Sequence, residues 1–490
     1  MKKHLLRLLM IVALCCGASV DAAPPANQTM TAQHLARLIA DPPALAELTL
    51  FFTRMPKGGD LHHHYSGAIY AEQYLEWVDR QGFCIDKNSY RIETDRALIA
   101  AQRQLGAATR SCLSAAETVA DDAVYRELLQ RWSSKDFANH GALQPPPDRQ
   151  FFETFGYFGP VSGTHIGEGL QSIKKRAIAE NVSYIETMFK MAPAINNDAF
   201  NQAVAQAGDD DSALTALFRT QAIALDNDPA FQQKIADYVA RVEASSADID
   251  DERFTMRYQT YAVRLLAPSQ VFSSLLAGFK AASQSPLIVG VNLVGAENQN
   301  VSMRDYSLHM KMLRFLKAQY PAVKLALHAG ELALGMVPPE GLKFHIDQAL
   351  TIAGADRIGH GVDLAHEANA LRTLKTMRDQ DVPVEINLTS NEFILGVKEQ
   401  SHPLTLYRKY AVPWVLSTDD AGVSRNTLAN EYVLFASRYR PDYAEIKKLS
   451  YNGLRYSFLP APEKKRLLKQ LDERFAQFEA EIAALHRKGR

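Results

Sequence analysis

Short apolar runs alternate with longer amphipathic stretches through most of this 490-residue chain. The short runs have the length of buried β-strands, and the longer stretches mix Ala, Leu and polar residues as helices do. The strand-like runs are 59–64, which is largely polar, and seven apolar runs at 182–189, 254–265, 287–294, 323–328, 357–362, 382–388 and 412–417. Eight strands separated by helices predict an α/β fold of the (β/α)8 TIM-barrel type, with catalytic groups at the C-terminal strand ends. A doubly wound open sheet has a similar alternation, but no Gly-rich phosphate-binding motif follows the first run.

Three segments lie outside this alternation. Residues 23–54 form a predicted N-terminal helical segment, with helix-like sequence at 30–52, ahead of a barrel domain at 55–490. A polar stretch at about 76–147, rich in Arg, Gln and Ala, predicts a helical insertion after the first strand, closed by a rigid linker at Pro145, Pro146 and Pro147. Residues 461–490 predict an extra terminal helix packed on the core, because apolar side chains recur three and four positions apart: Leu468, Leu471, Phe475, Phe478, Ile482 and Leu485.

The first residues have the pattern of a secretory signal peptide. Lys2, Lys3 and Arg7 precede an apolar run at 8–20 that is too short to span a bilayer, and small residues follow it. We predict a signal peptide at 1–22, cleaved after Ala22 or Ala23, and hence an exported protein that is periplasmic or secreted. An uncleaved anchor, or a lipoprotein attached at Cys15 or Cys16, is the alternative.

Composition narrows the class of partner. The chain is 47% hydrophobic and carries a formal net charge of -1, so it has no electrostatic footprint for a nucleic acid or an anionic membrane. No further long apolar segment follows the signal peptide, so we expect no membrane contact in the mature form. A small or neutral substrate is therefore expected.

Two cysteines remain after the signal peptide, Cys84 and Cys112. Export to an oxidising compartment favours a disulfide between them, which would contribute about 2–4 kcal/mol. Two unpaired buried thiols are the alternative.

His62 and His64 lie at the end of the first predicted strand. Because side chains alternate along a strand, both rings point into the barrel while His63 points away. Two converging imidazoles are half of a metal site. A chance cluster of histidines would have the same spacing.

Three further motifs follow predicted strands. His328 ends a buried run and can complete a metal triad with the two histidines of the first strand. Glu331, three residues later, would then lie near the metal, where burial would keep its carboxyl protonated and let it act as a general acid. His360, between two glycines, suits a general base or an orienter of water. Asp419 and Asp420 point in different directions, so one can bind metal and the other substrate. Each motif also has an alternative without catalysis. Glu331 would be an ordinary residue in the first turn of a helix, His360 a buried structural histidine, and one of the two aspartates a helix cap.

These motifs follow predicted strands one, five, six and eight, so a barrel would bring them to one rim. The residues resemble the adenosine deaminase family of the metallo-dependent hydrolase superfamily. The matching motifs occur in the family's order: Met55-Pro56-Lys57, His62-x-His64, His328-Ala329-Gly330-Glu331, Arg357-Ile358-Gly359-His360-Gly361, Thr389-Ser390-Asn391 and Ser417-Thr418-Asp419-Asp420. The Met-Pro-Lys lead-in, the signal peptide and the cysteine-bearing insertion are similar to the secreted branch, the adenosine deaminase growth factors.

The resemblance implies one zinc ion per chain and a purine nucleoside as the small-molecule partner. The implied zinc ligands are His62, His64, His328 and Asp419. Glu331 matches the acid that protonates purine N1, and His360 matches the histidine that orients or deprotonates the attacking water. Asp420 matches the carboxylate that binds that water and the substrate, and Gly295 matches the backbone contact to purine N3.

The chain departs from the family pattern at a few positions. Ser66 occupies the position where cytosolic members carry an Asp that contacts the ribose, so a substrate contact there would differ from theirs. Asn292 replaces an Asp, Asn387-Leu388 replaces Cys-Pro, and Ala421 replaces a Pro. The segment before Met55 is shorter than the dimerising region of the growth factors, so no oligomeric state is predicted.

The implied reaction is hydrolysis of adenosine or 2′-deoxyadenosine to inosine or 2′-deoxyinosine and ammonia. The chain lacks the Pro-Cys-x-x-Cys signature of the cytidine-deaminase-like zinc enzymes. One alternative is another amidohydrolase-type deaminase acting on a modified aminopurine, although the fourth predicted strand offers no lysine to bridge two metals. The other is a non-catalytic secreted binding or growth-factor-like protein, to which the insertion would belong.

Overall fold

The computed structural model describes residues 26–106, 109–137 and 145–488, so the predicted signal peptide lies outside the described residues. Its centre is a sheet of eight parallel strands in the order β1-β5-β6-β7-β8-β9-β10-β11. The strands are β1 (Lys57–His64), β5 (Val182–Met191), β6 (Thr255–Val263), β7 (Ile288–Val294), β8 (Lys324–Ala329), β9 (Arg357–His360), β10 (Val384–Ile386) and β11 (Trp414–Leu416). All eight predicted strands are confirmed, with ends shifted by a few residues.

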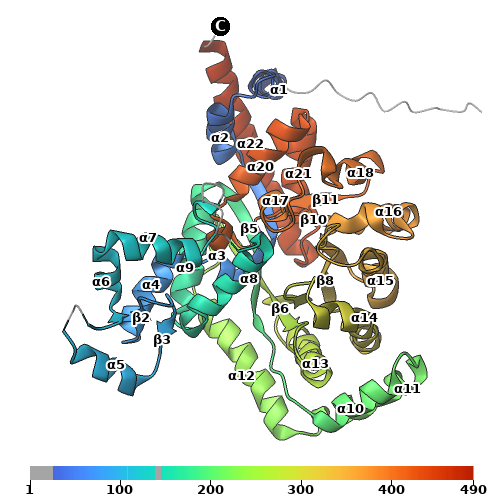
Figure 1. Cartoon of the computed structure of the whole chain (residues 1–490). Coiled ribbons are helices and arrows are strands. Elements are labelled where there is room, and N and C mark those ends of the chain that lie inside the picture. The colour runs from blue at the N-terminus through green and yellow to red at the C-terminus, as the bar shows by residue number, and fades with distance from the viewer. Residues whose placement is uncertain (1–25, 107–108, 138–144, 489–490) are drawn as a thin grey trace, which may run out of the picture.

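The first and last strands meet just beyond β11, which makes the sheet a nearly closed barrel. The backbone N–H of Asp419 donates to the carbonyl of His62 at 2.8 Å, and that of His64 donates to the carbonyl of Asp419 at 3.1 Å. Helices cover the outside of the barrel (Figure 1). This is the predicted TIM-barrel fold rather than an open doubly wound sheet.

The helices that follow the strands are mostly amphipathic, with the apolar side on the barrel. They are α3 (Tyr65–Ala68), α9 (Ile166–Ala179), α10 (Asp198–Ala207), α11 (Asp211–Asp226), α12 (Pro229–Ser245), α13 (Pro268–Gln284), α14 (Asn300–Gln319), α15 (His345–Gln348), α16 (Ala370–Asp379), α17 (Leu388–Leu395), α18 (Leu404–Lys409), α19 (Ala421–Ser424), α20 (Leu428–Tyr439) and α21 (Tyr443–Arg455). Short 3-10 turns lie between some of the helices and strands: η2 (Gly159–Val161), η3 (Pro339–Leu342), η5 (Val362–His366) and η6 (Glu399–Ser401). The π-helical turn η4 (Ala349–Ala353) continues α15.

The inside of the barrel carries a buried ionic network as well as apolar side chains. Arg357 on β9 donates to Glu186 on β5 at 2.6 Å and to Glu385 on β10 at 2.5 Å. All three side chains are at most 1% exposed. Since a buried charge is tolerated only when it is paired, these ion pairs hold the three strands in one register.

The terminal helices lie together at one side of the barrel (Figure 1). The helix-like stretch at 30–52 forms two helices, α1 (Ala26–Leu38) and α2 (Leu45–Arg54), because Pro42 and Pro43 interrupt it. Helix α22 (Ala461–Lys488) packs along α1. Within α22 the predicted apolar stripe is buried at its centre, but Leu467 is buried in preference to Leu468 and Leu485 is 48% exposed. A stripe of apolar side chains spaced three and four positions apart rotates gradually around a long helix. Near the C-terminal end of α22, His486 therefore faces α1 in place of Leu485.

The insertion after β1 is only partly helical, which corrects the prediction. It holds α4 (Ala71–Arg80), α5 (Arg96–Arg103), α6 (Ala115–Ala120), α7 (Asp122–Arg131) and α8 (Pro147–Phe158), and a small antiparallel sheet of β2 (Cys84–Asp86), β3 (Ile92–Glu93) and β4 (Cys112–Leu113). Such short strands carry no periodicity that could reveal them. Pro147 opens α8 rather than extending a linker, because the first turn of a helix tolerates proline.

A disulfide joins Cys84 on β2 to Cys112 on β4, with 5.4 Å between the Cα atoms. The alternative of two unpaired thiols is therefore not what the structure contains. Within the described residues, no helix has both the length and the apolar character needed to cross a bilayer.

Candidate metal centre and active site

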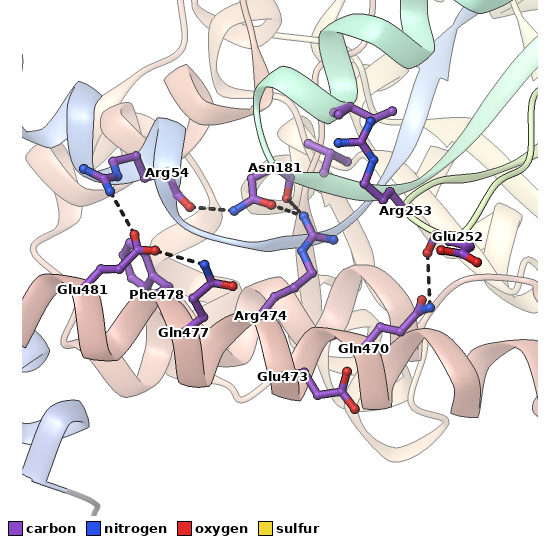
Figure 2. Close-up of a pocket in the computed structure, with 12 residues that line it drawn as sticks. Arg54, Asn181, Glu252, Arg253, Gln470, Glu473, Arg474, Gln477, Phe478 and Glu481 are labelled. Carbon is purple, nitrogen blue, oxygen red and sulfur yellow. Dashed lines mark hydrogen bonds and ion pairs between the residues drawn. The ribbon is translucent and has the colours of Figure 1, made fainter.

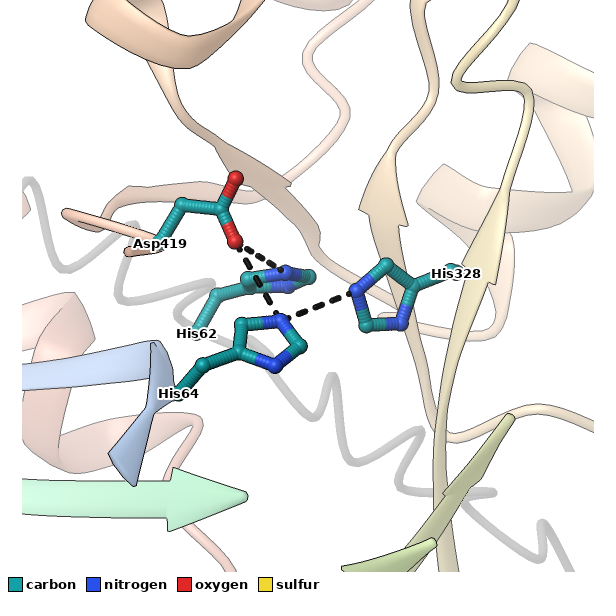
Figure 3. Close-up of side chains that lie close together, drawn as sticks. All are labelled: His62, His64, His328 and Asp419. Atoms are coloured by element: carbon teal, nitrogen blue, oxygen red, sulfur yellow. Dashed lines mark hydrogen bonds and ion pairs between the residues drawn. The ribbon is translucent and has the colours of Figure 1, made fainter. Parts of the chain in front are cut away.

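Three histidines and one aspartate converge at the C-terminal rim of the barrel (Figure 3). His62 and His64 come from β1, His328 from β8, and Asp419 from the turn after β11. One ligand atom from each lies within 4.8 Å of the others. Nε2 of His64 is 3.2 Å from Nε2 of His328 and 3.2 Å from Oδ1 of Asp419. His63 points away and contacts Thr187, as strand alternation predicts.

The donor set fits a metal ion. Nε2 of His62 is buried and makes no hydrogen bond to any described residue, and it lies 3.4 Å from Oδ1 of Asp419. Three imidazole nitrogens and one carboxylate oxygen, gathered in a buried position, are donor types that bind zinc in proteins. The four residues that the resemblance implies as ligands are thus the four that the fold brings together.

Two of the imidazoles are hydrogen-bonded through Nδ1, the ring nitrogen that does not face the cluster. Oδ1 of Asn292 lies 2.9 Å from Nδ1 of His328, and Oε2 of Glu385 lies 2.6 Å from Nδ1 of His62. Such acceptors fix the tautomer so that Nε2 faces the metal. Burial alone would raise the pKa of Glu385, but Arg357 and His62 outweigh it and hold that pKa below its usual value. Asn292 therefore serves as an acceptor despite replacing the family's Asp, and nothing in the local sequence around Glu385 pointed to its role.

Asp419 is fixed by both its backbone and its side chain. Its φ is +60°, a left-handed conformation that is uncommon outside glycine and clusters at functional sites. Oγ of Ser390 donates to its Oδ2 at 2.7 Å, which leaves Oδ1 facing the histidines. Burial would raise the pKa of Asp419, but contacts with His62 and His64 hold it well below the usual value.

Glu331 lies beside these residues in a turn rather than in the first turn of a helix. Burial, together with the carboxylates of Asp419 and Glu297, raises the pKa of Glu331 well above its usual value, so it holds a proton near neutral pH. Glu297 accepts from the backbone N–H groups of Gly330 at 3.1 Å and Glu331 at 2.8 Å. The turn requires glycine, because φ at Gly330 is +76° and a Cβ there would lie 2.3 Å from Oδ1 of Asp363.

His360 faces Glu331 across the site. Its Nε2 is 3.7 Å from Oε1 of Glu331, and with Asp419 the two residues form a second group of candidate ligand atoms within 4.8 Å of one another. Burial and the neighbouring His62 lower the pKa of His360 to about 3. A neutral ring beside a protonated carboxyl suits positioning of a polar substrate atom.

The remaining candidate residues line one cavity of about 310 Å³ next to the metal centre. Asp420 borders it with a buried Oδ1 that makes no hydrogen bond to a described residue, and its side chain does not cap α19. Ser66 and Gly295 also line the cavity, as do His64, His328, Glu331, His360 and Asp419. The fold thus gathers every candidate catalytic and substrate-binding residue at one cavity.

Sequence reasoning missed the apolar wall of this cavity. Phe151, Phe152 and Phe155 come from α8 of the insertion, and Tyr261 and Leu265 extend the wall from the end of β6. The aromatic spacing in α8 was visible in the sequence, but its target was not, because α8 reaches the rim only through tertiary contacts such as that with α17. Among the described residues that line the cavity, no side chain is lysine or arginine.

Figure 2 shows another cavity, of about 400 Å³, at the N-terminal ends of the strands. Three arginines and three glutamates line it, and Arg54 pairs with Glu481 at 2.9 Å. Arg474 donates to the carbonyl of Asn181 at 2.8 Å. The charges balance and no histidine stands among the described residues that line this cavity, so the candidate chemistry lies at the opposite rim.

Comparisons with known proteins show what this chain is similar to. A family model described as adenosine deaminase matches residues 197–474, a region that includes His328, Glu331, His360 and both aspartates. The chain is similar to adenosine deaminase of Danio rerio, 30% identical over 193 residues that cover 38% of this chain and 49% of that protein. It is similar to adenosine deaminase of Haemophilus ducreyi, 25% identical over 280 residues that cover 51% of this chain and 77% of that protein. The chain thus spans about half the length of several curated relatives it matches.

Solved structures share the fold. The N6-methyl-AMP deaminase of Arabidopsis thaliana is 18% identical with a TM-score of 0.53, covering 87% of this chain and 98% of its own. An amidohydrolase of Burkholderia ambifaria, solved with bound Zn, is 16% identical with a TM-score of 0.51, covering 89% of this chain and 94% of its own.

Proposed function

This chain belongs to the adenosine deaminase family, and from that premise we propose that it hydrolyses the 6-amino group of adenosine or 2′-deoxyadenosine, with one zinc ion per chain. The products are inosine or 2′-deoxyinosine and ammonia. One observation carries the proposal: His64, His328 and Asp419 of the candidate metal cluster border the same cavity as the buried carboxyl of Glu331.

His62, His64, His328 and Asp419 would hold the zinc. When bound, zinc acts as a Lewis acid that lowers the pKa of water from 15.7 to about 7 and so supplies a nucleophile at neutral pH. The Burkholderia ambifaria neighbour solved with bound Zn supports this choice of metal.

The chain's own residues supply the proton and the orientation. Glu331 donates its proton to purine N1, which offsets the negative charge that develops on the ring as oxygen adds to C6. His360 and Asp420 both line the cavity and position the attacking oxygen and the amino group. The C6–N bond then breaks and the C6–O bond remains as the carbonyl of the product. Of the two protons of water, one leaves with the amino group as ammonia and the other restores the proton that Glu331 gave to N1.

The cavity favours a neutral nucleoside over a nucleotide. A 5′-phosphate would need a cation or several donors, whereas the described lining carries aromatic side chains and no lysine or arginine. Phe152 and Phe155 offer the flat apolar surface that a purine ring requires. Ser66 and the backbone of Gly295 are the proposed contacts to the sugar and to purine N3.

We further propose that the protein works outside the cytoplasm, in the periplasm or as a secreted enzyme. The Cys84–Cys112 disulfide supports this, because such bonds persist in oxidising compartments. The basic and apolar start of the chain supports it independently.

The test is a panel of adenosine, 2′-deoxyadenosine, AMP, adenine and N6-methyladenosine with the zinc-loaded protein, followed by ultraviolet absorbance and ammonia release. We expect adenosine or 2′-deoxyadenosine to be preferred over AMP, and a chelator to abolish turnover. Glu331→Gln should lower kcat by at least about 100-fold with zinc still bound, while exposed Glu340→Gln serves as the matched control. Full activity of Glu331→Gln would refute the acid role, and preference for N6-methyladenosine would establish a modified aminopurine as substrate.

A further inference from the structure

We propose that His402, acting through Asn391, is a positioning residue that fixes the tautomer of His360, so that the neutral His360 ring presents Nε2–H to the cavity. The inference rests on the proposed function for its effect on turnover, but its structural content can be measured without any substrate. His402 lies in the turn between η6 and α18 and does not line the cavity.

The chain of hydrogen bonds begins at a backbone group. The N–H of Leu404 lies 3.1 Å from Nδ1 of His402. A backbone N–H can only donate, so Nδ1 of His402 must accept. The proton of the neutral His402 ring is therefore on Nε2. The ring is fully buried, and burial lowers the pKa of His402 to about 3, which keeps it neutral.

The proton on Nε2 of His402 fixes the orientation of the Asn391 side-chain amide. Nε2 of His402 lies 3.0 Å from Oδ1 of Asn391, which accepts the ring proton. The amide nitrogen of Asn391 then points the other way and lies 3.0 Å from Nδ1 of His360. A reversed amide would place its NH₂ group against Nε2–H of His402, two donors facing each other, so the backbone N–H of Leu404 excludes that orientation.

His360 is the end of the chain. Its Nδ1 accepts from Asn391, and Nδ2 of Asn387 lies 3.3 Å from the same atom. The proton of a neutral His360 ring is therefore on Nε2, the nitrogen that faces Glu331 at 3.7 Å. An Nε2–H can donate to the attacking oxygen but has no lone pair with which to remove its proton. The geometry thus favours the orienting role of His360 over the base role.

The side chains of the network are fully buried together. Asn391 lies near the start of α17, and His402 follows it by 11 residues. Both are 0% exposed. Because neither side chain hydrogen-bonds to His62, His64, His328 or Asp419 in the described structure, changes to them can be separated from loss of zinc.

The decisive experiment measures the tautomer directly. Zinc-loaded protein labelled with ¹⁵N-histidine is studied by NMR, and the His360 signals are identified by their loss in His360→Asn. We expect Nδ1 of His360 to be unprotonated and Nε2 protonated. Asn391→Asp should exchange them, because a carboxylate accepts from both His402 Nε2–H and His360 Nδ1–H. A protonated Nδ1 in the native protein, or no exchange in Asn391→Asp, would overturn the inference.

Turnover gives a second measurement. His402→Leu should lower kcat by at least about 10-fold with KM within about 2-fold and zinc content unchanged, because Asn391 can then rotate. His402→Gln should recover most of kcat, since its amide both accepts and donates. His366→Leu, at a half-buried histidine outside the network, is the matched control. An unchanged kcat in His402→Leu would refute the positioning role. If the native enzyme turned over no 6-aminopurine nucleoside, the proposed function would fail while the NMR result still decided this inference.

Discussion

Oε2 of Glu385 lies 2.6 Å from Nδ1 of His62, a contact between the first and seventh strands of the barrel. The other oxygen of Glu385 accepts from Nε of Arg357 at 2.5 Å. The carboxylate therefore holds the imidazole with Nε2 toward Asp419. This contact joins the ionic network inside the barrel to the metal centre at its rim.

Glu385→Gln should weaken zinc binding by about 10–100-fold, the usual cost of losing an acceptor behind a metal-binding histidine. The amide has one oxygen, so it cannot accept from both His62 and Arg357. Zinc affinity would be measured by competition with a chromogenic chelator, with circular dichroism to establish that the variant is folded. Exposed Glu340→Gln is the control, and unchanged affinity in folded Glu385→Gln would contradict the prediction.

Removing zinc should lower the melting temperature. Because the four ligands come from β1, β8 and the turn after β11, an ion there binds the folded state and not the unfolded chain. At a free concentration 1,000 times Kd the stabilisation is about 4.1 kcal/mol. Calorimetry after dialysis against a chelator should show the loss, with recovery on adding Zn²⁺ but not Mg²⁺, since imidazole ligands do not suit Mg²⁺. Recovery with Mg²⁺ would rule out the histidine site as the cause.

Phe155→Ala should lower kcat/KM for adenosine by about 10-fold, which corresponds to about 1.4 kcal/mol. The ring lines the cavity and offers apolar surface to a bound purine. Tyr157→Ala is the matched control, because Tyr157 lies on the same helix but does not line the cavity. Steady-state kinetics with zinc-loaded protein would decide, and equal losses in the two variants would point to disruption of α8 as a whole.

Lys190 should make stability depend on alkaline pH. Burial and the nearby Arg241 lower its pKa from 10.5 to about 8. Between these values the unfolded chain binds the proton and the folded chain does not, so the free energy of unfolding rises with pH. The gain is roughly 3 kcal/mol across that window.

In Lys190→Met this contribution is absent at every pH. The stability of the native chain relative to Lys190→Met should therefore increase from pH 7.5 to pH 10. Urea unfolding of both proteins would measure the difference, in which other titrating groups cancel. A constant difference across this range would show that Lys190 is not protonated differently in the two states.

Several features of the fold and the site followed from local patterns in the sequence. Seven of the eight strands were visible as short apolar runs, because strands of a parallel barrel are covered on both faces, and β1 was visible as a strand-like segment that ends in histidines. His62, His64, His328 and Asp419 could be picked out because each directly follows or ends such a run. The small sheet of the insertion could not, since strands of two or three residues leave no period to detect.

The residues that tune the site were hidden for a different reason. Glu385 meets His62 across 323 positions of sequence, and α8 meets the rim through contacts outside the insertion. In the sequence, nothing distinguishes His402 from any other loop histidine. Its role becomes visible only when the fold brings it into contact with Asn391 and the backbone of Leu404.

Residue chemistry and spacing alone thus determined the barrel and its candidate ligands, and marked Glu331 as a candidate acid, because periodicity and strand ends are local properties of the chain. Tertiary structure alone decided which nitrogen of each imidazole faces the centre, which carboxyl keeps its proton, and what closes the cavity. Those properties depend on burial and on hydrogen-bond partners, and both arise only when distant segments are brought together.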